Sequence, residues 1–69
     1  MTNLKQIRKV VGLSQAKLAE VSGVNLRMIQ HYEQGFKDIN KAEVLTVYHL
    51  AQALNCTIED LIEKEKAGA

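Results

Sequence analysis

The sequence lacks proline and tryptophan, and among its 69 residues it has only four glycines, one cysteine and three aromatic residues. β-Sandwiches and barrels need frequent turn residues and strand-forming aromatic side chains, so this shortage excludes an all-β fold. A single cysteine cannot form an internal disulfide, and with two histidines the chain offers no cluster of metal ligands. We therefore expect packing alone to hold the fold together.

Long apolar runs are also missing, and no basic segment followed by an apolar one opens the chain. We therefore expect no membrane span and no signal peptide, and hence a cytoplasmic protein. A chain of this size buries only roughly 60% of the surface that unfolding exposes. We expect one domain over residues 1–69, with a core at about 3–62 and a tail at 63–69 that frays from a helix end.

Apolar residues at helical spacing, set between good cap residues, predict five helices. Asn3, with Gln6 three residues later, predicts a reciprocal cap at the start of the first helix, which Gly12 ends. The apolar residues expected on its buried face are Leu4, Ile7, Val10 and Val11.

The next two predicted helices are short and follow each other closely. Ser14 is the expected cap of the second helix, which Ser22 and Gly23 end. Asn25 is the expected cap of the third helix, which Gly35 ends. The residues expected to be buried are Leu18, Ala19, Val21, Ile29 and Tyr32, with Met28 or Leu26 in part.

The last two predicted helices begin near residues 40 and 57. Asn40 and Glu43 predict a second reciprocal cap, and that helix stops near Asn55. Thr57 caps the final helix, whose first turn holds the acidic pair 59–60. The residues expected to face the core are Val44, Val47, Leu50, Ala51, Leu54, Leu61 and Ile62.

Residues 15–34, QAKLAEVSGVNLRMIQHYEQ, place two short helices around a tight turn. Two such helices cross steeply, which requires a small residue at their closest approach, a left-handed residue in the turn and apolar volume in the angle. Ala19 and Gly23 meet the first two requirements, and Val24 and Ile29 meet the third.

The segment resembles the helix-turn-helix of the phage repressor/Cro family, also called the XRE family, of bacterial and phage DNA-binding proteins. The resemblance covers roughly residues 3–62, although the chain is a few residues longer than the compact phage repressors between Gly35 and Leu50. It implies an all-α, lambda-repressor-like fold of five helices with the helix-turn-helix at the second and third. The matching segments are Gly12-Leu13-Ser14-Gln15, Leu18-Ala19-Glu20, Ser22-Gly23-Val24, Ile29, Tyr32-Glu33-Gln34-Gly35, Leu50-Ala51-Gln52-Ala53-Leu54-Asn55, and Ile58, Asp60, Leu61 and Ile62.

The same resemblance implies a sequence-specific, double-stranded DNA-binding transcriptional regulator of the repressor type, with its third helix in the major groove. Arg27 is the strongest candidate for base contact because its fork can bind guanine O6 and N7, the alternative being a solvated or phosphate-bound arginine. Leu26 and Met28 either meet thymine methyls or turn toward the core or a partner chain. The base-reading candidates are Leu26, Arg27, Met28 and His31, and the phosphate-binding candidates are Gln15, Lys17, Asn25 and Lys37.

Structural roles fall to residues that hold these helices in place. Arg8 and Glu33 occupy positions that form a partly buried ion pair in similar repressor domains. Such a pair joins the first helix to the end of the third, and so orients the third helix. Ala19, Gly23 and Ile29 shape the angle between the second and third helices.

Charge is distributed unevenly along the chain. The net charge is +4 up to Lys37 and −3 beyond it, so the positive field lies on the half that contains the third helix. Each chain neutralises few DNA phosphates, which favours a homodimer bound to two DNA half-sites that lie about one helical turn of DNA, ~34 Å, apart. We expect no cofactor, metal, membrane or small-molecule partner.

A protein-interaction module or antitoxin-like adaptor on the same fold is the alternative function. An enzyme is disfavoured because Cys56 has no base near it in sequence and is expected at a core position. His49 is expected at the surface or half-buried. The acidic residues near the end of the chain are interpreted as a helix-start bias and a solvated face: Glu59, Asp60, Glu63 and Glu65.

Overall fold

Three glycines divide the first half of the chain into helices. The computed structural model describes residues 2–63. Gly12, Gly23 and Gly35 adopt φ of +93°, +76° and +85°, left-handed values that end a helix without the strain of a Cβ. The helices are α1 (Asn3–Val11), α2 (Gln15–Ser22) and α3 (Leu26–Gln34).

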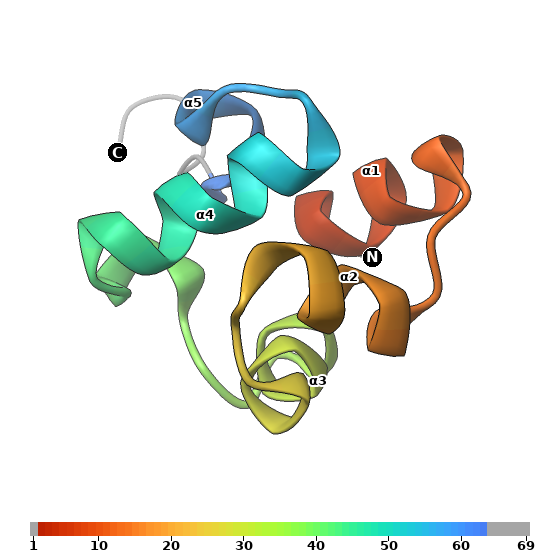
Figure 1. Cartoon of the computed structure of the whole chain (residues 1–69). Helices are drawn as coiled ribbons and strands as arrows, with labels where there is room; N and C mark the ends of the chain where they lie inside the picture. Colours follow the sequence, from red (N-terminus) through yellow and green to blue (C-terminus); the bar gives the residue numbers. More distant parts are fainter. Residues whose placement is uncertain (1, 64–69) are drawn as a thin grey trace.

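Residues 36–63 contain a short 3-10 turn and two further helices (Figure 1). These elements are η1 (Ile39–Lys41), α4 (Val44–Leu54) and α5 (Ile58–Leu61). Asn55 ends α4 at a positive φ of 56°. No strand occurs between residues 2 and 63, so the predicted all-α fold of five helices is confirmed.

Three of the predicted N-caps are confirmed. Ser14 Oγ accepts a hydrogen bond from the Lys17 amide at 3.0 Å, and Asn25 Oδ1 accepts one from the Arg27 amide at 2.7 Å. Thr57 and Asp60 cap each other reciprocally, each accepting at 3.1 Å from the other's amide. Each of these caps satisfies amides that the first turn of its helix leaves unpaired.

The two predicted reciprocal caps are wrong. Thr2, not Asn3, caps α1, and its Oγ1 accepts from the Lys5 amide at 3.2 Å. Glu43 is the N-cap of α4 without a side-chain hydrogen bond, and Asn40 lies within η1.

Both asparagines instead bond to the segment after α5. Asn3 Nδ2 donates to the Ile62 carbonyl at 2.8 Å, and its amide donates to the Glu63 carboxylate at 2.6 Å. Asn40 Nδ2 donates to the Glu63 carbonyl at 2.5 Å, while its Oδ1 accepts from the Glu63 amide at 2.7 Å. These long-range contacts replace the local capping that the sequence predicts.

The core is formed by apolar residues from one face of each α-helix. Four valines expected to be buried are exposed instead, with Val10 at 86%, because only a stripe of each helix faces the core. Ile62 is half-buried at the end of α5, and the tail beyond residue 63 lies outside the described residues. The exposed valines are Val10, Val11, Val21 and Val44, and the buried apolar residues are Leu4, Leu18, Val24, Ile29, Tyr32, Ile39, Val47, Leu50, Ala51, Leu54 and Leu61.

The arrangement of the helices leaves α3 at one side of the molecule (Figure 1). α2 packs against both α3 and α4, while α5 packs against α1 and α4. α3 is therefore attached mainly through α2 and α1. One long side of α3 faces away from the rest of the chain, and this side is the starting point for the functional site.

Candidate nucleic-acid interface

The inner side of α3 is fixed by burial. Ile29 is fully buried and Tyr32 nearly so, and Glu33 beside them is also buried. Ala19 of α2 is half-buried and packs against the same core as Val24 in the turn. The orientation of α3 about its own axis is therefore set by packing rather than by its outer residues.

The outer side of α3 presents polar side chains at helical spacing. Arg27 is exposed, and its guanidinium makes no hydrogen bond or ion pair with any residue between 2 and 63. Gln30 and His31 are half-exposed and Gln34 is exposed, at three, four and seven residues after Arg27. Sequence reasoning missed the two glutamines as part of this surface, although the 3.6-residue period from Arg27 points to both.

The apolar candidates of α3 differ in accessibility. Leu26 is exposed at the first position of the helix. Met28 is half-buried and packs against the core, so the structure favours the core alternative for this residue. The His31 ring meets the exposed Phe36 edge-on, with ring centroids 5.8 Å apart.

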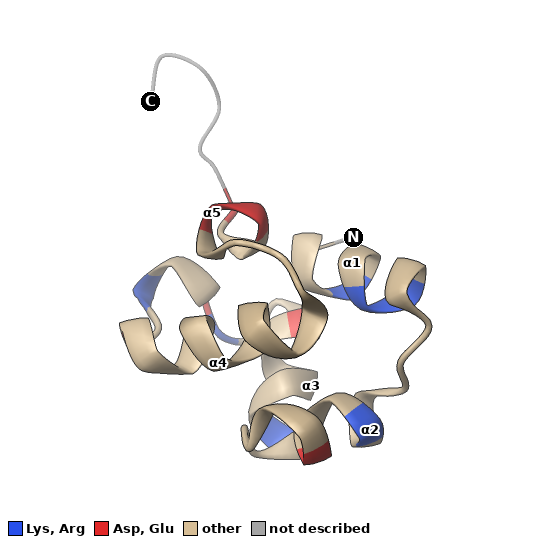
Figure 2. Ribbon diagram, turned by 45° about the horizontal axis from the view of Figure 1, so that its top comes forward, with Lys and Arg blue, Asp and Glu red and all other residues tan. Residues whose placement is uncertain are grey.

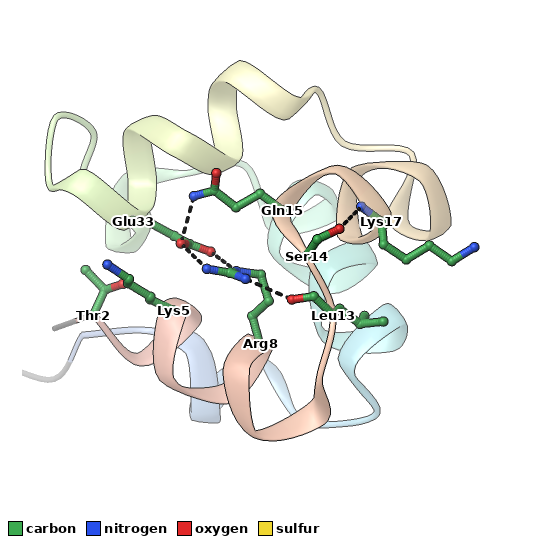
Figure 3. Close-up of polar contacts among 8 residues, drawn as sticks. All are labelled: Thr2, Lys5, Arg8, Leu13, Ser14, Gln15, Lys17 and Glu33. Carbon is green, nitrogen blue, oxygen red and sulfur yellow. Dashed lines mark hydrogen bonds and ion pairs between the residues drawn. The ribbon is translucent and has the colours of Figure 1, made fainter.

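The predicted ion pair between Arg8 and Glu33 is present (Figure 3). Arg8 Nε and Nη2 donate to the two carboxylate oxygens at 2.6 and 3.0 Å, and the two side chains are only 10% and 2% exposed. Arg8 Nη1 donates to the Leu13 carbonyl at 2.8 Å, and Gln15 Nε2 donates to Glu33 Oε1 at 3.0 Å. The hydrogen bond to Glu33 raises the pKa of Arg8 against the opposing effect of burial. One carboxylate thus joins α1, α2 and α3.

The start of α2 lies beside the end of α3 because Gln15 reaches Glu33. The backbone amides of Gln15 and Ala16 donate to no residue in the described chain, as expected for a helix start. Such amides and the helix dipole favour an anion. Lys17 extends outward from the same turn, as Figure 3 shows, and makes an exposed ion pair with Glu20 at 3.3 Å.

The remaining phosphate candidates flank α3. Asn25 uses its Oδ1 as the cap of α3 and keeps its side-chain nitrogen unbonded within residues 2–63. Lys37 is exposed just after α3, and its backbone amide donates to the His31 carbonyl at 3.2 Å. The DNA contacts of all these residues stay predictions.

The geometry of α2 and α3 agrees with the comparison with known families. The family model HTH_3, described as helix-turn-helix, matches residues 4–61. The chain belongs to this family. The resemblance to XRE-type helix-turn-helix proteins is therefore confirmed, and with it DNA binding of the transcription-regulator type. Comparisons with curated proteins and with solved structures gave no match.

In this helix-turn-helix protein the charged residues are distributed unevenly over the helices (Figure 2). α1 carries only basic charged residues, α2 and α3 each carry one Lys or Arg and one Glu, and Glu59 and Asp60 make α5 acidic. The net positive charge of these helices therefore comes from α1, while Lys17 of α2 and Arg27 of α3 supply single positive charges beside it. HTH_3 is a DNA-binding family and not an enzyme family.

The remaining features of the helix-turn-helix protein to consider are its cysteine, its metal-ligating side chains and the length of its helices. Cys56 is half-buried against the core, and burial, with the charge of Asp60 adding to it, raises the pKa of its thiol. The reactive thiolate is thus disfavoured. Among residues 2–63, no three metal-ligating side chains gather, and no helix is both long and apolar enough to span a bilayer.

Proposed function

We propose that this helix-turn-helix protein binds double-stranded DNA sequence-specifically as a repressor-type transcriptional regulator, with α3 in the major groove. The observation that carries the proposal is the contrast between the two sides of α3. Its inner side is held in place by the buried Ile29 and Tyr32 and by the ion pair of Glu33. On the outer side, the Arg27 guanidinium has no hydrogen-bond or ion-pair partner in the described chain.

Rigid support matters for base reading because a bidentate contact to a base edge needs a fixed helix. Arg27 lies in the first turn of α3, the part that enters the groove most deeply in this docking mode. Gln30 and His31 extend the same surface. We include Gln30 among the base-reading candidates because an amide can bind adenine N6 and N7 bidentately.

Phosphate contacts would set the position of α3 in the groove. The free amides at the start of α2 and the second N–H of the Gln15 side chain supply donors next to the Glu33 network. Lys17, Asn25 and Lys37 add donors on either side. In the proposed complex, the carboxylate that fixes α3 therefore also fixes the phosphate-binding amide of Gln15.

The proposal includes a pair of chains on two half-sites about one turn, ~34 Å, apart. Each chain contributes only a small net positive charge, so one copy neutralises few phosphates and binds weakly. A cytoplasmic location and a single domain over residues 1–69 belong to the same proposal.

Selection from a random pool of double-stranded DNA at two salt concentrations tests the proposal. We expect an enriched palindrome whose affinity falls steeply with salt. No enrichment by the folded protein would contradict the proposal and favour the protein-interaction alternative.

Arg27→Ala tests the reading mechanism, with Lys9→Ala on α1 as the control for loss of one exposed positive charge. Arg27→Ala should lose about 1–3 kcal/mol of discrimination at one base position and keep most non-specific binding. Lys9→Ala should keep the base preference unchanged. Equal weakening by Arg27→Ala on all sequences would make Arg27 a phosphate ligand.

A further inference from the structure

Helix α4 differs in charge from every other α-helix of the described chain. Its eleven residues, VLTVYHLAQAL, include no Asp, Glu, Lys or Arg, although 25% of the whole chain is charged. α1, α2, α3 and α5 each carry at least two charged residues. Burial explains the inner side of α4 but not its outer side, which is in water.

The outer face of α4 consists of residues at helical spacing, and it is largely apolar. Val44, Leu45 and Tyr48 are 72%, 66% and 44% exposed. The Tyr48 and His49 rings lie next to each other, with centroids 5.8 Å apart. The residues of this α4 outer face are Val44, Leu45, Tyr48, His49 and Gln52. Loss of charge combined with an aromatic residue is typical of the centre of a protein interface.

The other exposed apolar residues do not form a comparable face. Val10 and Val11 lie beside Lys9 at the end of α1, and Phe36 contacts only the His31 ring among aromatic partners. The exposed Val21 and Leu26 are single residues on α2 and α3 that stand next to the charged Glu20 and Arg27 in sequence. The cavity of about 210 Å³ between α1, α3 and η1 has a mixed lining that includes Lys37, Asp38 and Glu63, without a buried unpaired polar group in the described chain. The α4 outer face is therefore the strongest candidate.

We infer that the α4 outer face docks a second copy of this chain across a two-fold axis. A two-fold contact places a surface patch against itself, so like charges in the patch would meet. Self-pairing through the outer sides of α1 or α3 would bring together Lys9 or Arg27 of the two copies, and α5 would bring together acidic residues. The α4 outer face carries no such charge, while Lys41 and Glu43 supply both signs at its rim.

The position of this face keeps the DNA-binding helix free. The first turn of α4 lies at an edge of the molecule, and α2 lies between α4 and α3 (Figure 1). A second copy on the α4 outer face therefore leaves the outer side of α3 uncovered.

The area of the face predicts a weak dimer. The three apolar side chains expose on the order of 300 Å² per copy, against about 800 Å² per partner in a standard stable interface. Isolated chains should therefore be monomers when dilute and associate as the concentration rises. Two adjacent half-sites on DNA would hold two copies at high effective concentration and complete the dimer. This last step alone rests on the proposed function.

Sedimentation velocity without DNA tests the inference between ~10 μM and ~1 mM, the range expected for a weak contact. Leu45→Lys is the test variant and Val10→Lys is the matched control, because both replace an exposed apolar side chain by lysine. The wild type and Val10→Lys should associate alike, and Leu45→Lys at least tenfold more weakly. Val44→Lys serves as a second test variant with the same expected result.

A wild type that stays monomeric over this range, or lysine variants of α4 that associate like the wild type, would overturn the inference. Binding to DNA separates this outcome from failure of the proposed function. Leu45→Lys should bind a single half-site like the wild type and lose at least tenfold on the palindrome. Self-association that depends on Leu45 without any DNA binding would support the α4 interface and refute the proposed function.

Discussion

Removal of the Glu33 carboxylate by Glu33→Ala should destabilise the fold strongly. Glu33 accepts three hydrogen bonds, two from Arg8 and one from Gln15, in a site where its side chain is 2% exposed. Its loss leaves the Arg8 guanidinium buried without a counter-charge, which costs about 3–5 kcal/mol in comparable pairs. We expect the lower end, about 3 kcal/mol, because Arg8 keeps its bond to the Leu13 carbonyl.

The effect is large against the total stability of a small domain. At roughly 0.05–0.15 kcal/mol per residue, a chain of this length is stable by about 3–10 kcal/mol. A loss of about 3 kcal/mol lowers the melting temperature by about 12–24 °C in a domain of this size. Thermal unfolding followed by circular dichroism measures this shift directly.

Glu20→Ala is the matched control, because it removes the other glutamate of an ion pair but from an exposed site. The Lys17–Glu20 side chains are 55% and 72% exposed, and such pairs contribute at most about 1 kcal/mol. The melting temperature should therefore fall by only a few degrees. Equal shifts for Glu33→Ala and Glu20→Ala would refute the reasoning that burial makes the Arg8–Glu33 pair important.

Two further predictions concern the pH dependence of stability and the contact between η1 and the segment after α5. Burial raises the pKa of both Cys56 and Tyr32 above their ordinary values of 9.0 and 10.0, so the stability that these two groups contribute should be fully present below pH 9 and be lost as the pH rises through the raised values. Urea unfolding at pH 7 to 11 measures this fall, and an equal fall in the Cys56→Ala, Tyr32→Phe double variant would assign it to other groups. Asn40→Ala removes both bonds to the Glu63 backbone and should cost about 1–2 kcal/mol in the same assay at pH 7. An unchanged urea midpoint would mean that water replaces both bonds without loss.

The sequence predicted the helix ends better than the helix starts. Gly12, Gly23 and Gly35 mark the ends correctly because a left-handed residue is a local requirement of the backbone. The start of a helix depends on whether the side chain of the cap residue bonds to the helix amides or to another partner. Asn3 and Asn40 have good capping side chains, but the segment at 62–63 binds both across about sixty and twenty residues of chain. No local pattern contains that information.

Burial was predicted well in the centre of each helix and poorly near the ends. Val10, Val11, Val21 and Val44 keep the spacing of a buried stripe, yet each lies within two residues of a helix end, where the neighbouring helices no longer cover it. Spacing alone does not show how long the packing partner is. The burial of Val44 was thus predicted wrongly, and this exposed residue is a part of the α4 outer face.

Most residues of the candidate site were predictable, but not every hydrogen bond between them. The resemblance placed Arg8 opposite Glu33 and Arg27 on the outer side of α3, and the structure confirms both positions. The bond from Gln15 to Glu33 was not expected, because a residue proposed to hold a phosphate has no sequence signal for a second, internal partner. Gln30 was missed, although it lies three residues after Arg27 and next to the predicted His31.

The contact between Asn3 and Glu63 has a consequence for the topology of the chain. Residue 63 bonds to residue 3 directly and to η1 through Asn40, so hydrogen bonds join the segment after α5 to the start of α1. A short covalent link between these two points would add little loop entropy. The linked chain could then be cut in another loop, which changes the order of the helices along the polypeptide but not their places in the fold. The fold is therefore suited to circular permutation.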